Sequence, residues 1–148
     1  MPAFVEKIQW RPSMLDLNFL NPVREWILAA ARIMFGLLLL EHGTIKHLNF
    51  PEHPMNAVTW FQLSGVAGIL ELVFGTLLAV GLFARLSAFV LSGLAACAYF
   101  IAYAPKGFFP FLNGGESAVI YAFGLLVLAA YGPGKLALDS LRPGAKNK

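Results

Sequence analysis

Two charged side chains lie inside apolar stretches of the sequence, where they could do chemistry. Arg32 lies a few residues into one apolar stretch, and Glu71 lies near the middle of the next. A charge at the depth of a lipid bilayer is costly and usually faces a partner or a functional cavity. A long arginine side chain can cover much of the depth difference of about 9 Å that helical rise gives for the two backbones. We therefore predict an Arg32–Glu71 ion pair, which serves either helix register or a function.

Further polar side chains are expected to gather at one end of the helices. His42 and Lys46 are one helical turn apart, and Asn113 and Glu116 precede the last apolar stretch. A cation, an imidazole and a carboxylate at one place could bind a polar head group or carry protons. The plain alternatives are solvation of His42 and Lys46 at the membrane surface and helix capping by Asn113 and Glu116. The predicted ligand-binding set contains Arg32, His42, Lys46, Glu71, Asn113 and Glu116, with no catalytic residue assigned.

The remaining candidate ligands do not form a metal-binding pattern. His42 and His47 are five residues apart and do not share a helix face, so no metal site is predicted. The single cysteine, Cys97, excludes a self-contained CxxC redox centre and an internal disulfide. We interpret Cys97 as a small packing residue.

The elements that would position these side chains are membrane helices. Of the 148 residues, 58% are hydrophobic and 13% are charged, whereas about a quarter of a soluble domain is charged. Each apolar stretch is near the length of about 20 residues that crosses a bilayer, and none shows the alternation of a barrel strand. The sequence therefore predicts an all-α polytopic membrane protein, a four-transmembrane-helix bundle. The helices are expected at about 26–41 (with a continuation towards 46), 61–83, 86–103 and 117–131.

The charges predict how this bundle lies in the membrane. Residues 1–23 are expected to form a cytoplasmic tail or interfacial helix, residues 24–134 the membrane domain and residues 135–148 a cytoplasmic C-terminal tail. Lys and Arg crowd one side and are scarce on the other, which places both termini in the cytoplasm. No basic patch suggests nucleic-acid binding. The crowded side has Lys7, Arg11, Arg24, Arg85, Lys135, Arg142, Lys146 and Lys148, and the other has Lys46 and Lys106.

Glycines recur on the stripe that carries Arg32. At helical spacing, Arg32, Gly36, Gly43 and Lys46 lie on one face. Small residues let membrane helices approach closely. This face is therefore expected either to pack against a neighbouring helix or to admit a flat ligand.

The same residues carry a resemblance to a known family. The chain resembles the DoxX family of small bacterial inner-membrane proteins over about residues 29 to 139. The resemblance implies a four-helix inner-membrane protein. Some members resemble the quinone-linked subunit of a thiosulfate oxidoreductase, and others are associated with membrane redox complexes that handle thiol stress. The matching motifs are R-x-x-x-G (Arg32–Gly36), H-G-x-x-K (His42–Lys46), E-L-V-x-G (Glu71–Gly75), L-x-x-G-L-x-x-R (Leu78–Arg85), N-G-G-E-S-A (Asn113–Ala118) and Y-G-P-G-K-L-A-L-D (Tyr131–Asp139).

The function expected from these features is that of a membrane subunit of an oxidoreductase system. It would bind quinone or a similar lipid-soluble redox carrier and act as an enzyme only with a partner protein that delivers electrons. No intrinsic cofactor is predicted, because no cofactor-binding motif is present. The other hypotheses are a non-catalytic membrane scaffold and a small proton-coupled transporter centred on Glu71, in a homodimer. The lipid bilayer of the bacterial inner membrane is the expected surrounding.

Overall fold

The computed structural model describes residues 17–54 and 58–142, and within these ranges the fold is all-helical with no strand. The all-α class is therefore confirmed for the described residues. Four long helices form the body of the molecule: α1 (Arg24–Leu48), α2 (Leu63–Val80), α3 (Ala84–Ala98) and α5 (Glu116–Tyr131). The short elements are the 3-10 helices η2 (Asn18–Val23), η5 (Ala104–Lys106) and η6 (Leu138–Leu141), the π-helix η4 (Tyr99–Tyr103) and the single-turn helix α4 (Pro110–Asn113).

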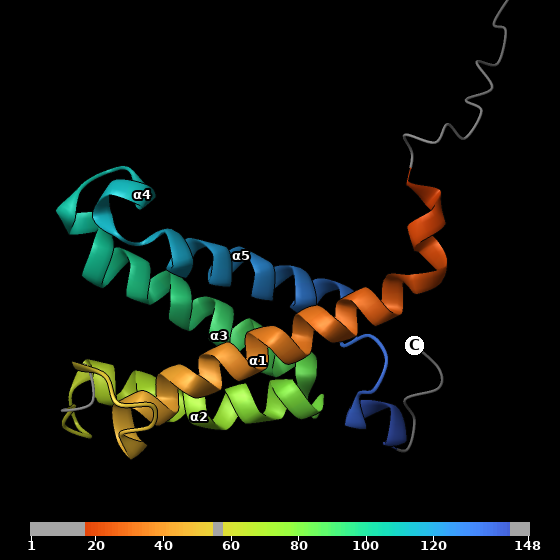
Figure 1. Ribbon diagram of the computed structural model, residues 1–148, viewed down its shortest axis with the longest axis horizontal. Helices are drawn as coiled ribbons and strands as arrows, with labels where there is room; N and C mark the ends of the chain where they lie inside the picture. Colours follow the sequence, from red (N-terminus) through yellow and green to blue (C-terminus); the bar gives the residue numbers. More distant parts are fainter. Residues whose placement is uncertain (1–16, 55–57, 143–148) are drawn as a thin grey trace, which may run out of the picture.

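The four long helices form two antiparallel pairs (Figure 1). α1 packs along α2, and α3 packs along α5, while α2 and α3 also contact each other beside the tight turn that joins them. The segment after α5 returns to the end of the molecule where α1 begins and α2 ends (Figure 1). The two ends of the bundle are therefore built differently, one with a tight turn and the returning segment, the other with the longer loops.

The predicted helices agree with the observed ones to within a few residues, and two of them extend further along the chain. α1 continues to Leu48, so that Lys46 and His47 are helical, and α3 continues through η4 and η5 to Lys106. Two helical stretches are long and apolar enough to cross a membrane, Leu63–Val80 and Ala84–Lys106. α5 is apolar but shorter, with 16 residues. The tail prediction for residues 1–16 falls outside the described residues, and the adjoining 18–23 form η2.

Glycines bring the α1 and α2 backbones into contact. A Cβ added to Gly36 would lie 2.6 Å from the Ala79 nitrogen, and one added to Gly75 would lie 2.9 Å from the Leu40 nitrogen. Carbon atoms cannot approach backbone atoms so closely without a shift. The glycine face of α1 is thus covered by α2. Of the two predicted uses of this face, helix packing is the one observed.

Leucines and small residues fill the centre where the helices meet. Leu78, Leu91 and Leu125 are completely buried there and come from α2, α3 and α5. The Ser92 hydroxyl donates to the Ala122 carbonyl oxygen at 2.7 Å, which ties α3 to α5. Side-chain hydroxyls of this kind are common links between membrane helices. The centre of the bundle is therefore apolar, and its charged side chains lie towards the two ends of α1.

Candidate functional site

Arg32 is fully buried, and carbonyl oxygens surround its guanidinium group. Nε donates to Pro133 O at 2.9 Å, and Nη1 donates to Leu78 O at 2.9 Å and Ala79 O at 2.6 Å. Nη2 donates to Lys135 O at 3.3 Å and Leu136 O at 3.0 Å. A guanidinium group has five N–H donors. The five carbonyls therefore account for its whole donor capacity.

Two of these carbonyls belong to the last turn of α2, where helix carbonyls have no partner within the helix. The other three belong to the segment that follows α5. A cation at a helix C-terminus also interacts favourably with the helix dipole. Gly81, with φ +76°, permits the close approach, because a Cβ there would lie 2.6 Å from Arg32 Nη1. Arg32 thus holds three parts of the chain, α1, α2 and the returning segment, at one point.

Asp139 completes this arrangement on the other side of the α2–α3 turn. Its carboxylate accepts hydrogen bonds from the backbone N–H groups of Phe83 at 2.9 Å and Ala84 at 2.8 Å, where α3 begins. Burial alone would raise the pKa of Asp139, but these two hydrogen bonds and the nearby Arg142 hold the pKa below its ordinary value. An anion at a helix N-terminus is favourable for the same reason as a cation at a C-terminus. We call Arg32, Asp139 and residues 132–139 the C-terminal clasp.

The predicted Arg32–Glu71 ion pair is wrong. The N–H groups of Arg32 donate to backbone carbonyl oxygens, and Glu71 pairs with Lys46 instead. The reason is geometric, since Arg32 lies opposite the last turn of α2, about two helical turns from Glu71. A helix terminus offers a buried cation unpaired carbonyls at that depth, so no carboxylate is needed there.

Lys46 and Glu71 form a buried ion pair between α1 and α2. Lys46 Nζ donates to both carboxylate oxygens of Glu71, at 2.8 and 2.7 Å, and the two side chains are only 11% and 9% exposed. Glu71 is the ninth residue of the 18-residue apolar helix α2, so its charge lies near the middle of that helix. Removing one member of such a pair leaves an uncompensated buried charge, at a typical cost of about 3–5 kcal/mol.

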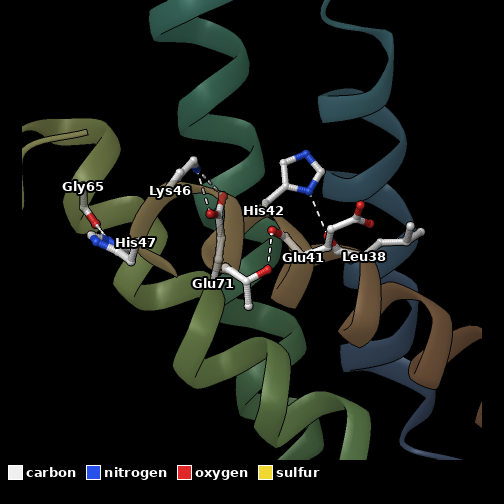
Figure 2. Close-up of polar contacts among 8 residues, drawn as sticks. Leu38, Glu41, His42, Lys46, His47, Gly65 and Glu71 are labelled. Carbon is white, nitrogen blue, oxygen red and sulfur yellow. Dashed lines mark hydrogen bonds and ion pairs between the residues drawn. The ribbon is translucent and has the colours of Figure 1, made fainter. Parts of the chain in front are cut away.

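Two histidines flank this ion pair on α1, as Figure 2 shows. His42 Nδ1 lies 2.8 Å from Leu38 O, and His47 Nε2 lies 2.8 Å from Gly65 O. A carbonyl oxygen can only accept, so these two ring nitrogens carry the protons. In the neutral rings His42 Nε2 and His47 Nδ1 are then acceptors, and within residues 17–54 and 58–142 the buried His47 Nδ1 has no hydrogen-bond partner.

Aromatic rings complete the surroundings of the pair. The Tyr121 ring of α5 meets the His42 ring edge-on at 6.0 Å, and the Trp60 ring lies 4.4 Å from the His47 ring. We call Lys46, Glu71, His42 and His47 the ion-pair cluster. Lys46, Glu71 and His42 were predicted as site residues from the sequence, whereas His47, Tyr121 and Trp60 were not. Continuing the first helix past Lys46 would have included His47.

The structure does not bring Asn113 and Glu116 to this cluster. Asn113 is the last residue of α4 and Glu116 the first of α5, at the end of the α3/α5 pair opposite the clasp. Asn113 Nδ2 donates to Gly107 O at 2.8 Å, and Asn113 Oδ1 accepts from the Gly115 N–H at 2.8 Å. The predicted capping box is also wrong, because Asn113 ends α4 and Gly115 is the N-cap of α5. The two glycines between Asn113 and Glu116 end one helix before the next begins.

The described residues contain no group of three or more His, Cys, Asp or Glu side chains that could hold a metal ion. Cys97 is exposed on α3. Its interpretation as a packing residue within the chain is therefore wrong.

Comparison with known proteins identifies the family. DoxX matches residues 27–104, a range that contains Arg32, His42, Lys46 and Glu71. The chain belongs to the DoxX family. A protein of Haemophilus influenzae (strain ATCC 51907 / DSM 11121 / KW20 / Rd), described as an uncharacterized protein, is 40% identical over 129 residues, which cover 84% of this chain and 96% of the relative. A second uncharacterized protein of the same strain is 39% identical over 71 residues, 48% of this chain and 47% of the relative. No solved structure matches the chain.

The two sets of polar residues divide the sequence motifs of the chain into two groups. The R-x-x-x-G, L-x-x-G-L and G-P-G-K-L-A-L-D pieces form the clasp, where Arg32 and Asp139 bind backbone groups. The H-G-x-x-K and E-L-V-x-G pieces form the ion-pair cluster. The membrane association of DoxX proteins agrees with the two apolar helices of this chain. The clasp has the bonding pattern of a structural feature, and the ion-pair cluster is the group of side chains that can exchange protons.

Proposed function

We propose that this DoxX protein is a membrane subunit of an oxidoreductase system and that its ion-pair cluster binds the head group of quinone or a similar lipid-soluble redox carrier. The observation that carries the proposal is the Lys46–Glu71 pair, an ammonium and a carboxylate bonded at 2.7 Å between apolar helices. Intramembrane ionisable groups are expensive and usually mark a ligand site or a proton path. The pair also has titratable neighbours in His42 and His47.

A quinone carbonyl needs a free N–H donor, which Lys46 can provide and Arg32 cannot. Arg32 has no N–H left to donate, and the glycine face of α1 is filled by the α2 backbone. Lys46 has three N–H donors and gives two to Glu71, which leaves one for a carbonyl oxygen. His42 Nε2 can accept from a hydroxyl group. The proposed site therefore comprises Lys46, Glu71, His42 and His47.

A quinone supplies a two-electron, two-proton couple, and the residues of this chain would serve its protons. Glu71 and His42 can each hold one proton and pass it on. Lys46 orients the carbonyl oxygen and balances the charge of Glu71. The electrons come from a partner protein, since the chain carries no motif for a redox cofactor. Catalysis is thus proposed for the complex and not for the isolated chain.

The proposal includes a placement in the bacterial inner membrane with four crossings, by α1, α2, α3 and α5. The clasp end carries Arg24, Arg85, Lys135 and Arg142, which supports a cytoplasmic position for that end and for both termini. The carbonyls of Ala129 and Ala130 at the end of α5 lie within 3.4 Å and 3.0 Å of Arg85 Nη1. An arginine in this position can extend to the head groups.

Quinone binding can be measured through Trp60, because its ring lies 4.4 Å from His47. The full chain, with Trp10 and Trp26 replaced by Phe, would be placed in nanodiscs and titrated with a short-chain ubiquinone. We expect saturable quenching of Trp60. The double variant Lys46→Met/Glu71→Gln removes both charges together and avoids an unpaired one; it should bind about tenfold more weakly, as for one lost hydrogen bond to a charged group.

Lys106→Met is the matched control, because Lys106 is exposed and stacks over Tyr103 instead of joining the cluster. Its affinity should equal that of the parent protein. Absence of saturable quenching in the parent, or equal affinity in the double variant, would reject the proposed site.

One observation favours the scaffold alternative. The charges of the ion pair are balanced without a ligand, since both Glu71 oxygens accept from Lys46 and both side chains are largely buried. A scaffold would keep its stability and its partner proteins in the double variant, whereas a redox subunit would lose turnover of the complex. A transporter centred on Glu71 would instead show substrate flux in vesicles that depends on a proton gradient and stops in Glu71→Gln.

A further inference from the structure

Large apolar side chains crowd a short loop at the end of the molecule opposite the clasp. The loop runs from residue 107 to 115, between η5 and α5, and we call it the aromatic loop. Phe108 is 86% exposed, Phe109 62%, Phe111 79% and Leu112 78%. Four such side chains within five positions form an apolar patch that a water-exposed loop rarely carries. A partner molecule is therefore expected to shield this patch from water.

Backbone hydrogen bonds within the aromatic loop pair several of its polar groups, as an apolar surrounding requires. Gly107 N–H donates to Ala104 O, Asn113 N–H donates to Phe109 O, and Gly115 N–H donates to Pro110 O, at 3.0–3.2 Å. The Asn113 side chain, 6% exposed, adds hydrogen bonds to Gly107 O and from the Gly115 N–H. Backbone groups near lipid must find partners inside the protein. Asn113 thus supplies inside the loop what water would otherwise supply.

The length of α5 determines how deep this loop lies relative to the membrane surface. Its 16 residues span about 24 Å at about 1.5 Å per residue, while a hydrocarbon core is about 30 Å thick. Arg85, bound to the carbonyls of the last turn, marks the head-group level at the Tyr131 end. The shortfall of about 6 Å therefore falls at the Glu116 end, next to the aromatic loop. A loop at that position cannot rise clear of the membrane.

We propose that the aromatic loop is an interfacial anchor, whose Phe108, Phe109, Phe111 and Leu112 side chains insert among lipids at the boundary between acyl chains and head groups. This inference rests on the membrane crossing of α5 in the proposed function, but not on quinone binding. Apolar side chains typically penetrate about 5–10 Å at this boundary.

Lipid is a better occupant than a second protein because the patch continues an apolar surface that already faces lipid. Phe100 and Ile101, on the apolar stretch Ala84–Lys106, are 69% and 57% exposed and precede the loop. The Lys106 ammonium group lies over the Tyr103 ring at 5.1 Å, an arrangement of aromatic and basic residues that is typical of the membrane surface.

Nitroxide labels would test this in nanodiscs of phosphatidylethanolamine and phosphatidylglycerol. In a Cys97→Ser background, single cysteines would be introduced by Phe111→Cys in the loop, Phe123→Cys in the middle of α5 and Leu141→Cys at the clasp end. All three positions are at least 67% exposed, so their labels differ in surroundings and not in packing. Relaxation by oxygen reports lipid, and relaxation by a water-soluble nickel chelate reports water. We expect a several-fold lower nickel effect at 111 than at 141, and the strongest oxygen effect at 123.

A label at 111 that matches the one at 141 would overturn the proposal and place the loop in water. Dipolar broadening at 111 with both relaxants excluded would also overturn it and indicate a second copy of the chain. A label at 123 that meets the nickel chelate would instead reject the α5 crossing, and with it the level assigned to the loop. The failure of the anchor is thus distinguishable from the failure of the four-crossing arrangement.

Discussion

Replacing Arg32 by methionine should release the C-terminal segment from the bundle. The substitution keeps much of the side-chain length but removes all five N–H donors. Five carbonyls lose this donor, those of Leu78 and Ala79 at the end of α2 and those of residues 133, 135 and 136; the Leu78 carbonyl still accepts from the Gly81 N–H at 3.1 Å. The end of α2 cannot move away because α1 packs along it. The returning segment can, so we expect the damage there.

The expected magnitude follows from the number of groups left unsatisfied. A hydrogen bond to a charged group contributes about 1.5–3 kcal/mol, and a buried polar group without a partner costs about 1–3 kcal/mol. The five terms are not additive, because release of the segment lets water reach the carbonyls. We therefore expect Arg32→Met to lower the free energy of unfolding by about 3–5 kcal/mol, which corresponds to two or three of these terms. Arg32→Lys, with three donors, should lose less.

Limited trypsin digestion would locate the effect, because Lys135 lies in the clasp and its N–H donates to Glu25 O at 3.0 Å. Cleavage after Lys135 should be slow in the parent protein and fast in Arg32→Met. Arg24→Gln, which removes an exposed cation paired with Glu25, is the matched control and should leave the cleavage rate unchanged. A protected Lys135 and unchanged SDS unfolding in Arg32→Met would refute the clasp.

Three further outcomes follow from single contacts. Gly36→Ala places a Cβ 2.6 Å from the Ala79 nitrogen and should cost about 1–3 kcal/mol in SDS unfolding, whereas Gly93→Ala, with nothing within 4 Å of its Cβ, should cost nothing. Among the described residues the buried Ser87 hydroxyl has no hydrogen-bond partner, so Ser87→Ala should be neutral or stabilising by up to about 1 kcal/mol; a clear loss of stability would contradict this expectation. Asp139 has a lowered pKa in the folded state, so its stabilisation should be full above about pH 4 and should disappear as the pH falls through the folded pKa. Thermal unfolding of Asp139→Asn should lack this pH dependence, and an identical profile in both proteins would contradict it.

The helices were predictable because each is a long apolar run with clear ends. The Gly132-Pro133-Gly134 sequence follows the last run, and α5 ends there, whereas α2 ends at Val80, three residues before the predicted end of the second run. The short helix α4 was not predicted, since a single helical turn within an aromatic loop has no periodic pattern to detect. Local sequence therefore determined the elements, and the return of residues 132–142 to α1 required long-range contacts that no local pattern contains.

The candidate site was predicted in part, and its two errors have different causes. Residue types correctly singled out Arg32, Lys46 and Glu71 as charges that need partners, but the pairing was chosen from helix depth alone. Depth estimates ignored backbone carbonyls as acceptors, although the end of α2 offers unpaired ones. The assumption that Asn113 and Glu116 would face His42 failed because the loops at one end of a bundle can satisfy their polar groups separately.

The glycine contacts explain the observed pairing of the charges. In an antiparallel helix pair, a residue further along one helix faces a residue correspondingly earlier in the other. Gly36 lies against Ala79, and Gly75 lies against Leu40, which fixes this register along the whole interface. The same register places Glu71 beside the turn that contains Lys46 and leaves Arg32 beside the end of α2. Close glycine contacts determine how two membrane helices align, and this alignment decides which charges meet. The ion-pair cluster and the clasp therefore lie at separate places on α1, and substitutions in one should leave the other intact.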